Sequence, residues 1–147
     1  MSGKKKDDLL RLSPKHPDQE FHVIIPLGIS VNHLYTQLKG RKFMTKKGIE
    51  YMRMVGEIAM RAVESQSYEL EEEGVWLVCE LTYFFPDKRR RDAHNMHKIV
   101  MDALEHIAFK EDRWLLVRDM YVGLDKENPR IEVRIYPQEN VETVGNC

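Results

Sequence analysis

The chain has 147 residues, of which 42% are hydrophobic and 32% are charged, and its formal net charge is −1. These values are typical of one soluble domain with its own core, and the near-neutral charge says nothing about a polyanionic partner. No apolar run approaches the roughly 20 residues of a membrane span, and no apolar signal-peptide core follows the basic N-terminus. We therefore expect a cytoplasmic protein without membrane contact. Cys79 and Cys147 are too few and too far apart for a disulfide framework or a zinc site.

The two ends of the chain show no regular pattern. Residues 1–19 contain basic residues and two prolines, which predicts a mobile basic arm, and residues 138–147 predict a disordered tail. Residues 20–137 predict a single domain, since no repeat or linker interrupts them. Its first element is a short β-branched strand, FHVII, which ends at Pro26. The following segment, to Phe43, contains turn residues and predicts a long loop or an irregular hairpin.

Two helices and three further strands complete the predicted domain. Apolar residues recur at helical spacing from Thr45, a suitable N-cap, to about Ser65. A second helix is predicted over residues 95–109, and strands are predicted over 75–85, 114–122 and 130–136. This order predicts an α+β fold in which a small mixed β-sheet carries two main helices packed on one face.

Lysines and arginines gather in three clusters close to predicted turns. The clusters are Lys4 to Lys6; Lys39, Arg41, Lys42, Lys46 and Lys47; and Lys88 to Arg91. Runs of this kind are usually solvated surface, but three of them near turns also suit a face that binds nucleic-acid phosphates. Tyr35 and Phe43 border the second cluster, where they could stack on unpaired bases or equally anchor the loop.

The stretch RRRDAHNMHKIVMDAL combines arginines with groups suited to phosphodiester hydrolysis. Asp92 stands before the second helix, Lys98 and Asp102 share its polar stripe, and Asp112 follows it. In a structural interpretation, Asp92 caps the helix and Lys98 pairs with Asp102. In a catalytic interpretation, carboxylates hold a divalent metal ion, the lysine stabilises charge on the phosphate, and the arginines grip the DNA backbone.

A longer segment, RRRDAHNMHKIVMDALEHIAFKEDRW, resembles the signature of the RusA family of Holliday-junction resolvases. That signature has basic residues, Asp-x-Asp-Asn, a lysine three residues on, Asp-Ala-Leu, and an acidic pair before a strand. The matching residues here are Asp92, His94, Asn95, Lys98, the run Asp102-Ala103-Leu104, and the pair Glu111-Asp112. The segment PLGISVNHLYTQLKGRKFMTKKGIEYMR is similar to the family's opening segment through Asn32, Tyr35, Arg41, Thr45, Gly48 and Tyr51.

The resemblance implies a small homodimeric endonuclease that binds branched DNA and cuts four-way junctions symmetrically with Mg²⁺ or Mn²⁺, without a small-molecule cofactor. Many members of the family are encoded by phages or prophages. By position, Asp92 and Asp112 match metal-binding catalytic carboxylates, and Lys98 matches an essential lysine. Asn95 and Asp102 match supporting positions of the motif. The candidate DNA-binding residues are Arg89, Arg90, Arg91, Lys39, Arg41, Lys42, Lys46, Lys47, Asn32 and Tyr35.

The sequence departs from the family pattern at His94, where the pattern has its second aspartate. An imidazole can bind a metal ion, but it adds no negative charge and suits softer ions than Mg²⁺. Three interpretations stay open: His94 binds the metal ion or orients a metal-bound water, Glu111 or Asp102 supplies the missing charge, or the protein binds junctions with weak or no cleavage. A surface imidazole hydrogen-bonded to a neighbour is the structural alternative.

The two matching aspartates pose a geometric problem. A helix over residues 95–109 would be roughly 22 Å long, and Asp112 follows its end by three residues, a reach of at most about 10 Å. Asp92 and Asp112 of one subunit therefore share a metal ion only if the helix is shorter; otherwise a second subunit completes the site.

Two rival functions remain: a junction- or single-strand-DNA-binding protein that lost cleavage through His94, and a protein-interaction domain whose basic loops are solvated.

Overall fold

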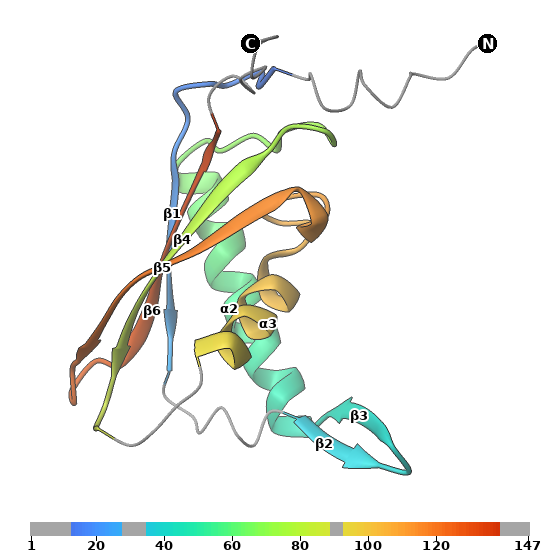
Figure 1. Ribbon diagram of the computed structural model, residues 1–147, viewed down its shortest axis with the longest axis vertical. Helices are drawn as coiled ribbons and strands as arrows, with labels where there is room; N and C mark the ends of the chain where they lie inside the picture. The colour runs from blue at the N-terminus through green and yellow to red at the C-terminus, as the bar shows by residue number, and fades with distance from the viewer. Residues whose placement is uncertain (1–12, 28–34, 89–92, 139–147) are drawn as a thin grey trace, which may run out of the picture.

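A four-stranded β-sheet with two α-helices on one of its faces forms the protein (Figure 1). The computed structural model describes residues 13–27, 35–88 and 93–138. The strands of this sheet are β1 (Phe21–Pro26), β4 (Leu77–Phe85), β5 (Leu115–Leu124) and β6 (Arg130–Pro137). The helices are α2 (Lys46–Ser65) and α3 (Ala93–Leu104). The predicted α+β fold, with a small mixed sheet and two main helices, is confirmed.

The strand order in the sheet is β1-β6-β4-β5. Strand β6 runs antiparallel to both of its neighbours, whereas β4 and β5 are parallel. Every second residue of β6 is buried, including Ile131, Val133 and Ile135, and β1 alternates in the same way. This period of two gives the sheet one core face, which the helices cover, and one outer face turned to solvent.

Helix α3 is the crossover that the parallel pair of strands requires. Its buried residues recur at helical spacing and join the hydrophobic core; they are Met96, Ile99, Val100, Ala103 and Leu104. The helix begins two residues before the predicted start and ends five residues before the predicted end. The prediction of a helix over residues 95–109 is therefore right in kind and wrong at both boundaries.

Helix α3 ends early because a turn over residues 106–108 follows it, and His106 in this turn has a positive φ of 70°. The His106 N–H donates to the Phe109 carbonyl at 2.7 Å, and Glu105 and Phe109 form an isolated β-bridge. Ala108 and Phe109 reach the core from this turn, so their apolar side chains imitate a continuing helix in the sequence. A short 3₁₀ helix, η2 (Asp112–Trp114), then leads into β5.

Helix α2 begins where the sequence predicts it. The Thr45 hydroxyl accepts a hydrogen bond from the Gly48 N–H at 3.0 Å, which satisfies one of the free donors of the first turn. Tyr51, buried on the inner side of the helix, donates from its hydroxyl to the Pro26 carbonyl at 2.7 Å and so ties α2 to the end of β1. Cys79 is a buried thiol in β4.

A separate hairpin, β2 (Tyr35–Leu38) and β3 (Arg41–Met44), projects from the start of α2, away from the four-stranded sheet (Figure 1). Its two turn residues, Lys39 and Gly40, have φ values of 50° and 75°. Positive φ at both positions of a two-residue turn matches the twist of the strands that it joins. Over residues 35–44, the segment predicted as a loop or irregular hairpin is thus a regular hairpin.

The arm predicted over residues 1–19 is described from Ser13 onward. The backbone N–H groups of Lys15 and His16 donate to the carboxylate of Glu71 at 2.8 and 2.7 Å, and Glu71 is only 3% exposed. These bonds satisfy a carboxylate that is out of reach of bulk water. At the other end, residues 139–147 lie outside the described residues. Within the described ranges, no helix is long and apolar enough to cross a membrane.

Candidate active site

Lys98 lies on the solvent-facing side of α3, opposite the buried stripe. Its side chain is 52% exposed, and its Nζ atom lies 3.3 Å from a carboxylate oxygen of Asp102, one turn later. The predicted pairing of these two residues is confirmed. An exposed pair at this spacing contributes only about 0.3–0.5 kcal/mol. A phosphate oxygen can therefore replace Asp102 as the partner of this ammonium group at small cost.

The carboxylate of Asp119, in β5, lies beside the same helix, where side chains from α3 and β4 contact it. Its Oδ1 atom accepts a hydrogen bond from the Tyr83 hydroxyl at 2.6 Å and lies 2.8 Å from Nε2 of His97. Tyr83 is fully buried in β4 and His97 belongs to α3, so the carboxylate links the helix to both parallel strands. Burial, together with the nearby Asp119, raises the pKa of the Tyr83 hydroxyl far above its usual range. The phenol therefore stays protonated and keeps donating.

Asp119 was not among the predicted site residues. The available signal was an acid inside the largely apolar strand WLLVRDMYV, because a carboxylate that packs under a helix needs hydrogen-bond donors. Its partners Tyr83 and His97 are 36 and 22 residues away in the chain, so only the fold shows which donors those are.

Asp112 is exposed at the first position of η2. The residue before it, Glu111, forms an ion pair with Arg113 at 3.3 Å. Because η2 leads straight into β5 and α3 meets β5 at Asp119, Asp112 lies roughly 15–20 Å from Asp119 along the strand. Within one subunit, the structure therefore does not bring Glu111 and Asp112 to the Asp119 cluster.

The remaining predicted residues divide into two sets. Asn32, Arg89, Arg90, Arg91 and Asp92 lie outside the described residues. His94 and Asn95 occupy the first turn of α3, and Tyr35 and Lys42 lie in strands β2 and β3; for these four residues the structure describes the backbone.

The second basic cluster extends along the projecting hairpin and into α2. Lys39, Arg41, Lys46 and Lys47 are all exposed, at the hairpin turn, on β3 and in the first turn of α2. Phe43, on β3, is an exposed aromatic side chain beside them. A two-stranded ribbon fits the major groove of DNA, and lysines and arginines on it neutralise phosphates. This surface is the described region best suited to a nucleic acid.

The groups near α3 and η2 offer oxygen ligands to a cation. Asp112 is exposed, and the Asp119 side chain is 34% exposed. Carboxylates of this kind suit hard divalent ions such as Mg²⁺ and Mn²⁺. Among the side chains that the structure describes, which do not include that of His94, no three His, Cys, Asp or Glu residues come close enough together to hold a metal ion. The donor chemistry of these carboxylates fits such an ion, which would need further ligands from elsewhere, such as a substrate phosphate.

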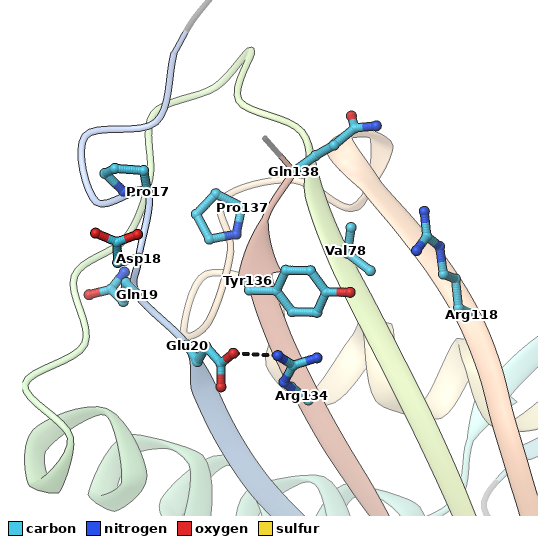
Figure 2. Close-up of a pocket in the computed structure, with 10 residues that line it drawn as sticks. All are labelled: Pro17, Asp18, Gln19, Glu20, Val78, Arg118, Arg134, Tyr136, Pro137 and Gln138. Atoms are coloured by element: carbon cyan, nitrogen blue, oxygen red, sulfur yellow. Dashed lines mark hydrogen bonds and ion pairs between the residues drawn. The ribbon is translucent and has the colours of Figure 1, made fainter. Parts of the chain in front are cut away.

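A pocket of about 430 Å³ opens on the outer face of the sheet, and its lining includes Glu20, Arg118, Arg134 and Tyr136 (Figure 2). Arg134 is held between the carboxylates of Glu20 and Glu80. The Tyr136 hydroxyl also donates to Glu80, at 2.8 Å. The hydrogen bond from Arg134 is the main reason that the pKa of Glu20 lies below its usual range. Since carboxylates of the chain already neutralise Arg134, this pocket is a poor phosphate site.

The sequence is similar to known proteins over most of the described fold. The sequence profile of the family described as Endodeoxyribonuclease RusA matches residues 26–136. The chain is also 26% identical, over 93 residues, to a protein named Crossover junction endodeoxyribonuclease rusA from Enterobacteria phage HK97. That alignment covers 63% of this chain and 73% of the phage protein. Because the family match takes in the hairpin, both helices and most of the sheet, the chain belongs to the RusA family of endodeoxyribonucleases.

Proposed function

We propose that this protein is a divalent-metal-dependent endonuclease that resolves four-way DNA junctions, and that it is phage or prophage encoded. The observation that carries the proposal is the family match over residues 26–136, which contains the signature segment with Lys98 exposed on α3. The relative from phage HK97, named a crossover junction endodeoxyribonuclease, supports the same substrate and the same kind of genome.

In this function, Lys98 stabilises the negative charge that develops on the phosphate during cleavage. Asp92 and Asp112 hold Mg²⁺ or Mn²⁺, which when bound activates water and stabilises the leaving oxygen. Asp102 supports the lysine through its 3.3 Å contact, which holds the ammonium group on the outer side of α3. Asn95 takes the second supporting position, in the first turn of the same helix.

The hairpin and the start of α2 form the proposed DNA-binding surface, together with the arginines that precede α3. Lys39 at the hairpin turn and Arg41 beside it contact phosphates, since both are exposed on a projecting ribbon. Phosphate contacts of this kind fix the position of the protein on DNA without reading its sequence. Preference for a branched substrate then comes from the shape of the junction.

A second copy of the chain is the proposed partner, and β5 is the proposed contact. This strand is at the edge of the four-stranded sheet, and its Met120, Tyr121, Val122 and Leu124 are each 53–60% exposed. An apolar edge strand is a site where another chain can pair. Val122→Lys should therefore give monomers in size-exclusion chromatography with light scattering. The control Met60→Lys, similarly exposed on α2, should leave the mass unchanged; a dimer that survives Val122→Lys rules out this contact.

A dimer also addresses the separation of the two aspartates. Helix α3 has 12 residues, shorter than predicted, which makes it about 18 Å long. Asp112 nevertheless lies before the start of β5, while Ala93, the chain neighbour of Asp92, is at the opposite end of α3. We infer that the second subunit completes the site. Mixed dimers of Asp92→Asn and Asp112→Asn subunits should regain one intact site, and no regain from two inactive variants contradicts this inference.

The direct test is cleavage of a synthetic four-way junction beside a linear duplex of the same sequence, with Mg²⁺ and with Mn²⁺. The proposal expects paired cuts in the junction and none in the duplex. Tight junction binding without cleavage in either ion would favour the rival, a binding protein that lost cleavage through His94. No preference for the junction over the duplex would instead contradict both, and would favour a protein-interaction domain.

A further inference from the structure

The RusA signature has a carboxylate where this chain has His94. Under the proposed function, that difference removes one negative charge from the segment that binds the metal ion. The two acids considered from the sequence are poorly placed to restore it. Asp102 lies eight residues further along α3, about 12 Å along the helix axis, and Glu111 lies beyond the helix and pairs with Arg113.

Asp119 is better placed, because it meets α3 close to position 94. Its Oδ1 atom lies 2.8 Å from Nε2 of His97, which follows position 94 by three residues, less than one turn of the helix. At about 100° per residue, position 94 falls between His97 and Lys98 around the helix axis. The side of α3 that carries position 94 therefore borders both the Asp119 carboxylate and the lysine.

The surroundings of Asp119 hold it in place at the edge of solvent. Beneath it, the fully buried Tyr83 donates to it at 2.6 Å. Beside it, the His97 side chain is 25% exposed, and Asp119 itself is 34% exposed, so an ion can reach the carboxylate. Hydrogen bonds to a ligating carboxylate orient it and tune its affinity for a metal ion.

We propose that Asp119 supplies the metal-binding carboxylate charge that the RusA signature has at position 94, with Tyr83 and His97 as its positioning residues. The inference rests on the proposed metal-dependent function. The alternative is that Asp119 only ties α3 to β4 and β5. The two roles differ in what they require, since a metal ligand needs the negative charge and a tether needs only hydrogen-bond acceptors.

Asp119→Asn separates these roles, because the amide oxygen still accepts hydrogen bonds while the charge is lost. Mn²⁺ affinity is measured by electron paramagnetic resonance of the free ion, and folding by the thermal unfolding midpoint. The dissociation constant for Mn²⁺ should rise about 10-fold or more, with little change in the midpoint. The control Asp18→Asn, an exposed aspartate near the outer-face pocket, should change neither.

Restoring the family's charge is the second arm of the experiment. His94→Asp in the Asp119→Asn background should bring Mn²⁺ affinity back toward that of the wild type. If Asp119→Asn also lowers the midpoint, affinity that recovers while the midpoint stays low still supports the metal role. Asp119→Glu, which keeps the charge, should stay within a few-fold of wild-type affinity.

Two failures are distinguishable. Unchanged Mn²⁺ affinity in Asp119→Asn, with a wild type that binds Mn²⁺ and cuts junctions, overturns this inference and leaves the proposed function standing. A wild type that neither binds Mn²⁺ nor cuts a junction contradicts the proposed function itself, and the inference falls with it.

Discussion

Two groups of polar side chains lie on opposite faces of the same sheet, and they are built on different principles. On the outer face, Arg134 is held by Glu20 and Glu80, so each charge meets an opposite charge from the same chain. On the helix face, the Asp119 carboxylate contacts the hydroxyl of the buried Tyr83 and the imidazole of His97 in α3. Lys98 projects from the same helix and forms an ion pair with Asp102.

This difference separates a group that serves stability from a group that can act on another molecule. Exposed ion pairs contribute about 0–1 kcal/mol each, and a closed set of them leaves no charge for a substrate. The group around α3 instead places charged atoms at the boundary between a buried core and solvent. Substitutions in the group around α3 should therefore have large effects on activity, and substitutions in the outer-face group should have small effects on activity.

The largest effect is expected for Asp112→Asn, which removes a proposed metal-binding charge. Junction cleavage should fall on the order of 100-fold or more, while junction binding in Ca²⁺ persists. Single-turnover cleavage and gel-shift titrations measure the two quantities. Glu132→Gln, which removes an ion pair with Arg130 on the outer face, is the control and should cleave at a near-normal rate. Near-normal cleavage by Asp112→Asn would remove this residue from the site.

The hydrogen bonds of two matched tyrosines, one on each face, should contribute differently to the free energy of unfolding. Tyr83→Phe leaves the Asp119 carboxylate without its buried donor and should cost about 1–3 kcal/mol of unfolding free energy. Tyr136→Phe removes a similar bond to Glu80, but its hydroxyl belongs to a partly exposed tyrosine whose place water can take, and it should cost less than about 1 kcal/mol. Urea denaturation measures both, and equal costs would contradict the distinction drawn between the faces.

The pH dependence of stability should also differ between the faces. Burial raises the pKa of the Cys79 thiol to about 12, and it also raises those of Tyr51 and Tyr68. These groups stay neutral when folded but ionise when unfolded, so their contribution to stability should be complete below about pH 8.5 and should fall as the pH rises toward 12. Urea midpoints at pH 7 and pH 10 check this, and equal midpoints would contradict it.

On the outer face, the pH dependence of stability should have the opposite sign. Hydrogen bonds from Arg134 and Tyr136, which outweigh the effect of burial, hold the pKa of Glu80 below its usual range. Its contribution is therefore present above the unfolded pKa of about 4.3 and is lost as the pH falls through the lower folded value. Glu80→Gln should flatten the acid limb of the stability curve and leave the alkaline limb unchanged; an unchanged acid limb would argue against this role.

The smallest effect concerns DNA affinity. Lys39→Ala and Arg41→Ala should each reduce the slope of log binding constant against log salt by about one. Arg118→Ala, an exposed arginine at the outer-face pocket, should leave that slope unchanged. Salt titrations of junction binding compare the three variants. An unchanged slope in both hairpin variants would exclude the hairpin from the phosphate-binding surface.

The fold could largely be predicted because burial follows the periodicity of each element. Alternation in β6 and helical spacing in α2 each give the element and its buried face. The end of α3 could not be predicted, since Ala108 and Phe109 are apolar and buried but lie in a turn. The left-handed backbone in this turn is at His106, and the glycine that usually marks such a position in a sequence is missing.

The candidate site was predictable only where its residues are close in sequence. Lys98 and Asp102 share one helical stripe, so their contact follows from spacing alone. The meeting of Asp119 with Tyr83 and His97 depends on how β4, α3 and β5 are layered, which no local pattern specifies. The residues that the sequence missed are therefore those that tertiary structure brings together.

The catalytic role of Lys98 is tested most sharply by comparing Lys98→Ala with Arg134→Gln in single-turnover cleavage of a four-way junction. Both variants remove one positive charge, the first from α3 and the second from the ion-paired outer face. We expect a loss on the order of 100-fold or more for Lys98→Ala and a near-normal rate for Arg134→Gln, with both proteins folded at the assay temperature. Equal rates for the two variants would contradict that role.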